Sequence, residues 1–258
     1  EAIALIKSKL IDNPVLEKQL NNSCHKILMC KRWAFLGNKK SDWNNTDLQS
    51  SSARLLNRQL SKHAITVLKN NQVLPLEITD SLKVACLLMG PDSGDFFYNR
   101  LNSYLPVSKY IYSSSSDSSN LFQKLDKYDL VITSLHYPDN KFWEKHNLNI
   151  GDSIFLEKLS KKNNVILNIF GHPRLLNSIN VSDVQAIILS YQNSLDFQDL
   201  SAQLHYGSIS ATGKLPISLK QFSAGDGLFL NKSRNFQFSL PIEAGLNIDS
   251  LNKIDTLV

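Results

Sequence analysis

Residues 185–219 read QAIILSYQNSLDFQDLSAQLHYGSISATGKLPISL, and this stretch decides the fold class. The apolar run Ala186–Leu189 leads into the polar turn Tyr191–Asn193. An amphipathic helix is expected next, followed by the Gly-rich turn Gly207–Gly213 and a short strand near Leu215–Leu219. A buried strand that feeds a helix, with polar residues at the strand's C-terminal end, is the unit that forms a crevice in open α/β sheets.

The rest of the chain repeats this alternation. The predicted strands are near Lys83–Met89, Ser108–Tyr112, Tyr128–Ser134, Asn164–Phe170 and Val184–Ser190, and the segments between them are Asp95–Tyr104, Ser119–Leu125, Gly151–Lys162 and Asp196–His205. Most inner strands are continuous apolar runs, which is typical of strands covered on both faces of a parallel sheet. The sequence therefore predicts an α/β fold, a three-layer αβα sandwich with a mostly parallel sheet.

The flanking segments predict four regions. Residues 1–37 have the pattern of two helices separated by Pro14, and residues 38–76 have the pattern of a polar linker followed by a helix over about Ser50–Lys69. Residues 77–222 form the predicted sandwich, and residues 223–258 a linker and the start of a further domain. Because both ends of the chain fall in helical patterns, we expect it to be a piece of a longer protein.

Composition excludes several classes of function. The 258 residues carry a net charge of +5, but no basic run exceeds two residues, whereas a nucleic-acid-binding surface would cluster them. No apolar run is long enough to span a bilayer. The six histidines lack metal-ligand spacing, and no phosphate-binding glycine motif is present, so no metal and no cofactor are expected.

The best candidates for ligand contact follow the strands. Because the carboxyl ends of parallel strands meet at one edge of the sheet, polar residues just past them lie near one another. They are Asp92, His136, His172 and Asn193, with Tyr137 (and Trp143) able to offer an aromatic face to a sugar ring. Each also has a structural alternative: a turn, a helix cap, loop ordering or packing.

Three segments resemble family 3 glycoside hydrolases, on the side of the β-N-acetylglucosaminidases. Residues 27–37, ILMCKRWAFLG, resemble the pattern that ends the family's N-terminal (β/α)₈ barrel. Residues 58–76, RQLSKHAITVLKNNQVLPL, resemble the start of its second domain, and residues 185–219 the segment that closes it. The final PIEAGLNIDSLNKIDTLV resembles the lead-in to a serine β-lactamase-like domain, which some bacterial members carry.

This resemblance implies a role without catalytic residues. The family's nucleophile carboxylate, and the His–Asp acid/base pair of the N-acetylglucosaminidase branch, belong to the barrel, and their motifs are not in this chain. The resemblance implies a domain that caps the barrel's active site, shares its carbohydrate substrate, and is inactive alone. It also implies a periplasmic or secreted enzyme. The alternatives are a non-catalytic binding or scaffold module and an independent flavodoxin-like ligand binder.

Overall fold

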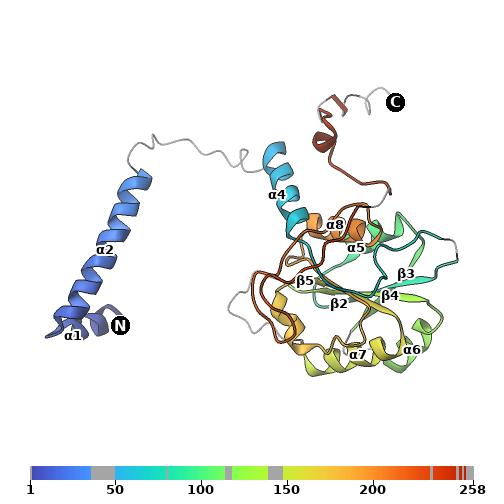
Figure 1. Cartoon of the computed structure of the whole chain (residues 1–258), viewed down its shortest axis with the longest axis horizontal. Helices are drawn as coiled ribbons and strands as arrows, with labels where there is room; N and C mark the ends of the chain where they lie inside the picture. The colour runs from blue at the N-terminus through green and yellow to red at the C-terminus, as the bar shows by residue number, and fades with distance from the viewer. Residues whose placement is uncertain are drawn as a thin grey trace. The chain divides into compact units, whose positions relative to one another are not determined.

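A computed structural model describes residues 2–35, 50–79, 81–113, 118–138, 148–232, 235–247, 250–251 and 253 (Figure 1). The chain divides into two compact units, Glu1–Gln49 and Ser50–Val258. The first contains α1 (Ala2–Leu10) and α2 (Pro14–Phe35). Pro14 takes the first position of α2, where its missing N–H costs nothing, and Asn13 Oδ1 accepts a hydrogen bond from Leu16 N at 3.0 Å. The two predicted helices are confirmed, and Gly37, their expected end, lies outside the described residues.

The second unit is built on a six-stranded sheet. The strand order is β1-β6-β5-β4-β2-β3, with β1 (Thr66–Asn70) antiparallel to β6 and the other pairs parallel. The parallel strands are β2 (Val84–Met89), β3 (Val107–Tyr112), β4 (Leu130–His136), β5 (Val165–Phe170) and β6 (Ala186–Leu189). Strands β2, β4, β5 and β6 are buried along their whole length, as their continuous apolar runs predict.

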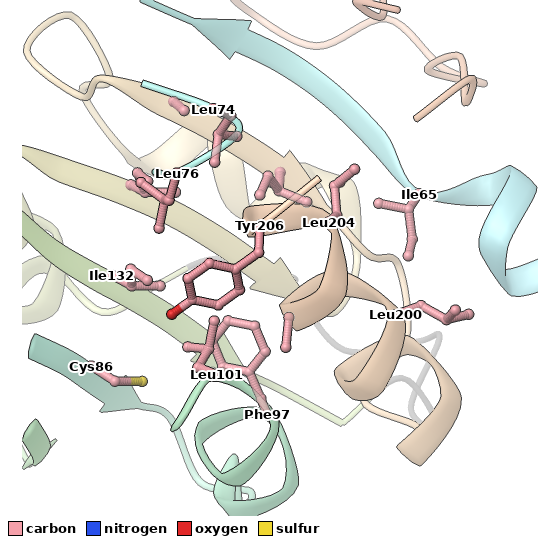
Figure 2. Close-up of a cluster of buried hydrophobic side chains, with 14 of the residues drawn as sticks. Ile65, Leu74, Leu76, Cys86, Phe97, Leu101, Ile132, Leu200, Leu204 and Tyr206 are labelled. Atoms are coloured by element: carbon pink, nitrogen blue, oxygen red, sulfur yellow. The ribbon is translucent and has the colours of Figure 1, made fainter. Parts of the chain in front are cut away.

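Helices cover both faces of the sheet (Figure 1). One core contains residues of α5 (Asp95–Asn102) and α8 (Leu195–His205), and Figure 2 shows Phe97, Leu101 and Tyr206 packed together in it. The core of the other face contains residues of α6 (Ser118–Leu125), α7 (Ile150–Lys162) and the 3₁₀ turn η1 (Pro173–Ser178). The predicted three-layer sandwich is therefore confirmed.

The predicted helix Ser50–Lys69 is too long. Helix α4 covers Ser51–Ala64, with the Ser50 hydroxyl accepting from Ala53 N, and the chain then becomes strand β1. Residues Ile65, Thr66 and Val67 are buried on all sides, which an amphipathic helix on the surface would not allow. The apolar spacing that continues to Val67 follows the strand's packing instead.

The predicted strand Leu215–Leu219 is also wrong. This segment is irregular, because β1 already occupies the free edge of β6. Its backbone bonds go to its own loop: Leu215 N donates to Asp226 O, and Leu219 N to Phe222 O.

Helix α8 differs from an amphipathic surface helix, because every residue from Phe197 to His205 is buried. A strap of residues 235–244, ending in the 3₁₀ turn η2 (Pro241–Ala244), covers its polar side. Gln203 Nε2 donates to Phe238 O at 2.9 Å, and Phe238 N donates to Gln203 Oε1 at 2.9 Å. The strap thus satisfies polar groups that water would bind on an ordinary surface helix.

Candidate functional site

The site lies where the order of the strands reverses. The chain leaves β2 toward β3 and then returns to β4 on the opposite side of β2, so the topological switch point lies between β2 and β4. In open α/β sheets, ligands bind in the crevice outside the carboxyl ends of the strands at this point. Asp92 follows β2 here, and His136 ends β4.

His136 fills this crevice. Its side chain is fully buried, and its ring stacks on Phe170 with centroids 4.6 Å apart and planes 10° apart. A Cβ placed on Gly94 would lie 2.2 Å from His136 Nε2, so only glycine fits at the start of α5. Gly90, at φ +110°, is under the same constraint, because a Cβ added there would lie about as close to the His136 carbonyl oxygen. The crevice that holds ligands in other folds of this kind is therefore closed by a side chain.

Burial also fixes the charge of His136. It lowers the pKa of the imidazole to about 4, against opposing effects of Asn193, Asp92 and Asp95. The ring is thus neutral at pH 7. The hydrogen bonds fit a proton on Nδ1, which donates to Asn193 Oδ1 at 2.8 Å, while Nε2 accepts from Ser134 Oγ at 3.0 Å.

Asn193 connects the loops that follow β2 and β6. Its Oδ1 also accepts from Gln198 Nε2 at 2.9 Å, and its Nδ2 donates to Asp92 Oδ2 at 3.4 Å and to Ser93 O at 3.5 Å. Gln198 Oε1 in turn accepts from Phe97 N at 3.0 Å. One buried amide cluster therefore holds the ends of three strands in a single arrangement.

The carboxylates whose charges act on His136 are those of Asp92, which is half-buried, and Asp95, which is exposed. Asp95 forms an ion pair with Lys109, and hydrogen bonds from Lys109 and Ser93 lower the pKa of its carboxyl. A glycosidase acid requires the opposite, a carboxyl whose pKa is raised. Among the described carboxyls, burial raises the pKa of Asp152, which interacts with Tyr112 and Tyr137 at the ends of β3 and β4. Asp152 therefore lies at the same edge, on the face of the sheet that α6 and α7 cover and away from His136.

Two predicted site residues do not join the cluster. Tyr137 follows His136 directly and therefore points to the opposite face, packed against the α6–α7 core. Burial and the nearby carboxylate of Asp152 raise the pKa of Tyr137 to about 12. His172 Nδ1 accepts from Arg174 N at 3.2 Å and so caps η1, its structural alternative. Trp143 lies outside the described residues.

Sequence reasoning missed two residues of this edge, Gly94 and Gln198, and it placed Tyr191 at the edge without foreseeing its backbone conformation. Tyr191 has a left-handed backbone, φ 59°, directly after β6, and its hydroxyl lies 2.8 Å from Thr66 Oγ1 on β1. Such a conformation in a non-glycine residue marks a constrained position. Nothing in the local pattern signals it, because the constraint comes from a contact 125 residues away.

The cluster can position loops and present Asp92 and Asn193 as hydrogen-bonding groups to a polar ligand. Among the described residues, no three His, Cys, Asp or Glu side chains are grouped to hold a metal. In the same part of the chain, no helix has both the length and the apolar character needed to cross a membrane.

The fold is shared with parts of three solved enzymes, two of which are named as members of glycoside hydrolase family 3. A fungal multi-domain GH3 β-N-acetylglucosaminidase matches at 18% identity with a TM-score of 0.57, over 69% of this chain and 20% of that one. A family 3 β-N-acetylglucosaminidase from Paenibacillus sp. str. FPU-7 matches at 15% identity and TM-score 0.51, over 76% and 39%. A β-glucoside phosphorylase BglX bound to 2FGlc matches at 17% identity and TM-score 0.51, over 72% and 35%.

No model of a known protein family matches the sequence, and no curated protein matches it either. The chain spans well under half the length of the solved structures above. At these identities the likeness establishes the fold, and it confirms at that level the resemblance to the second domain of family 3 glycoside hydrolases.

Proposed function

We propose that this chain is the α/β sandwich domain of a larger glycoside hydrolase that acts on β-linked N-acetylglucosamine or related β-glycosides. A (β/α)₈ barrel elsewhere in the same protein would supply the catalytic groups. The observation that supports the proposal is the shared fold with a domain-sized part of family 3 enzymes. Export to the periplasm or the medium belongs to the same proposal.

In this proposal the carboxyl edge of the sheet caps the barrel's active site. The buried His136–Asn193–Gln198 cluster holds the edge loops rigidly, so that Asp92 and Asn193 meet the substrate in a fixed geometry. Rigid placement of binding groups lowers the entropy lost on binding. The chain itself would contribute binding and no proton transfer, because the carboxylates that cleave the glycosidic bond would lie on the barrel.

A scaffold role is the second candidate, and one observation favours it. His136 is the residue of the edge best suited to proton transfer, but its side chain is fully buried and its hydrogen bonds to Asn193 and Ser134 hold the loops together. If Asp92 does the same, the sandwich only keeps its neighbouring domains in place.

Asp92→Ala in the parent enzyme separates the two candidates. The capping role predicts a rise in the KM for an aryl N-acetyl-β-glucosaminide of about fivefold to tenfold, with kcat and thermal stability retained. This corresponds to the loss of one hydrogen bond to substrate. Asp183→Ala, an exposed carboxylate before the amino end of β6, is the matched control and should leave KM unchanged. A loss of stability with KM unchanged would instead support the scaffold.

A further inference from the structure

A cavity lies away from the carboxyl edge, where the strap crosses the C-terminal end of α5. It encloses about 460 Å³ and is lined by Ile78, Ser103, Tyr104, Asn235, Phe236, Gln237 and Phe238. Helix α5 begins beside the end of β2 and runs back toward the start of β3, so Tyr104 lies near the amino ends of the strands. The cavity is therefore distinct from the cluster around His136.

The strap is fixed where it forms the cavity wall. The fully buried Gln203 makes both hydrogen bonds to the backbone of Phe238, and the Arg100 guanidinium lies 3.6 Å from the centroid of the Phe238 ring. Tyr104 Oη donates to Phe236 O at 2.6 Å, and Asn235 Nδ2 donates to Tyr206 O at 2.6 Å. The cavity is thus preorganised by contacts to α5 and α8.

On this fixed backbone the Phe236 side chain is exposed. It is 90% accessible to solvent, and the partly buried Tyr104 lines the same cavity. Single exposed apolar residues are common and need no explanation. Here, however, Phe236 belongs to a cavity lining that combines apolar and aromatic residues (Ile78, Tyr104 and Phe238) with the amides of Asn235 and Gln237 and the hydroxyl of Ser103. Apolar and aromatic walls with a few polar groups are the composition of a small-molecule site.

The lining also limits the ligand. All of the described lining residues are uncharged, so the cavity complements a neutral molecule. Aromatic rings pack against the C–H face of a pyranose, while Asn235 Oδ1, Gln237 Nε2 and Ser103 Oγ can hydrogen bond to its hydroxyls. The volume lies within the roughly 300–1,000 Å³ of typical ligand pockets.

We propose that this cavity is a non-catalytic saccharide-binding site that takes a neutral pyranose unit of a β-linked glycan. The choice of glycan rests on the proposed function, whereas the aromatic and amide lining does not. Because the cavity is separate from the carboxyl edge of the sheet, a glycan bound there would be held on the protein outside the active site.

The test is a titration of the 258-residue chain with N,N′-diacetylchitobiose and with cellobiose, followed by calorimetry or ligand-observed NMR. We expect saturable binding to at least one sugar, weakened about tenfold or more by Phe236→Ala. The matched control is Phe229→Ala, which removes a ring that is 67% exposed and does not line the cavity. It should bind as the unmodified chain does. If Phe236→Ala lowers thermal stability, Gln237→Ala, which removes one amide from the wall, provides the same comparison.

Absence of saturable binding, or equal weakening by Phe236→Ala and Phe229→Ala, would overturn the proposal. So would self-association of the chain through Phe236 without sugar binding. These outcomes are separate from the proposed function, which depends on glycosidase activity of the parent protein. If the parent protein hydrolyses glycosides but the cavity binds no sugar, only the proposal of this binding site is wrong. If the cavity binds sugar but the parent protein has no glycosidase activity, only the hydrolase assignment is wrong.

Discussion

Gly94 is the residue on which the closed crevice most depends. A methyl group at this position would lie 2.2 Å from His136 Nε2, and the ring cannot retreat because it is stacked on Phe170. We expect Gly94→Ala to lower the free energy of unfolding by about 1–3 kcal/mol, the usual cost of overpacking a core. Urea unfolding of Gly94→Ala and of the unmodified chain measures this difference in the free energy of unfolding.

Gly151→Ala is the matched control for this substitution. Gly151 lies in α7, where a Cβ would lie 3.3 Å from Asn149 Oδ1, and alanine favours a helix over glycine by up to about 1 kcal/mol. The control should be neutral or stabilising. Equal stabilities for the two variants would mean that His136 is free to move.

Two buried histidines make stability depend on pH. Burial lowers the pKa of both His136 and His205 to about 4, below the usual 6.5 of an unfolded chain. Between these values the unfolded state binds more protons, so stability is complete above pH 6.5 and is lost as the pH falls toward 4. The slope should approach about 1.4 kcal/mol per pH unit for each histidine.

Urea unfolding at several pH values between 4 and 7 checks this dependence. His205→Gln should remove about half of the slope, whereas His63→Gln, at an exposed position, should leave it unchanged. An unchanged slope in His205→Gln would show that the ring is accessible to protons in the folded state.

The sequence could place the residues of the site but not their burial. Asp92, His136 and Asn193 follow strands whose apolar runs are recognisable, so their common edge was predictable. The closure of the crevice requires Gly94 and Phe170, which come from two other elements. Tyr137 shows most clearly what the sequence analysis could not resolve. Successive side chains along a strand point to opposite faces of the sheet, so Tyr137 and His136 lie on different faces although they are adjacent in the sequence.

At the scale of elements, α4 is held to α8 and the strap by one buried side chain. The Arg58 guanidinium, 5% exposed, forms ion pairs with Asp196, Asp199 and Glu243, and also donates to Phe238 O at 2.9 Å. Arg100 forms a second ion pair with Asp199. No local pattern predicts this network, since its members are spread from residue 58 to residue 243 and only folding brings them together.

Arg58→Met should therefore destabilise the chain strongly. It leaves Asp199 buried beside fewer positive charges, and breaking a buried ion pair in this way costs about 3–5 kcal/mol. Hydrogen exchange should also show faster exchange over residues 235–244, because the strap loses two of its anchors. Arg54→Met, at an exposed position on the same helix, should change neither quantity. A stable Arg58→Met variant with a protected strap would contradict this role and show that the remaining contacts, from Gln203, Tyr104 and Asn235, hold the strap without Arg58.

At the scale of the whole molecule, the second unit follows its sequence closely. Each predicted inner strand is present within a few residues, because buried parallel strands are uniformly apolar. The segments between them, predicted as helical or irregular, contain the helices α5, α6, α7 and α8. The two errors, over residues 65–69 and 215–219, both concern the antiparallel edge. At that edge β1 pairs with β6 in the antiparallel direction, and the alternation of strands and helices that predicts parallel strands does not predict such a strand.

The arrangement explains why a sandwich of this kind would act as an accessory to chemistry. Its switch-point crevice is filled by His136, its edge loops are held by hydrogen bonds, and the Asp95 carboxylate beside the crevice is ion-paired with Lys109. Glycoside hydrolysis needs two carboxyl groups on either side of one bond, one of them with a raised pKa. Those groups are expected from a barrel in the parent protein.

The most direct test of this account is the hydrolysis of a 4-nitrophenyl N-acetyl-β-D-glucosaminide, and of the matching β-glucoside, by the parent protein and by the 258-residue chain alone. The account predicts turnover of at least one substrate by the parent and none by the isolated chain. Turnover by the isolated chain that disappears in Asp92→Ala or Asp95→Ala would contradict it, and so would a parent protein that hydrolyses neither substrate.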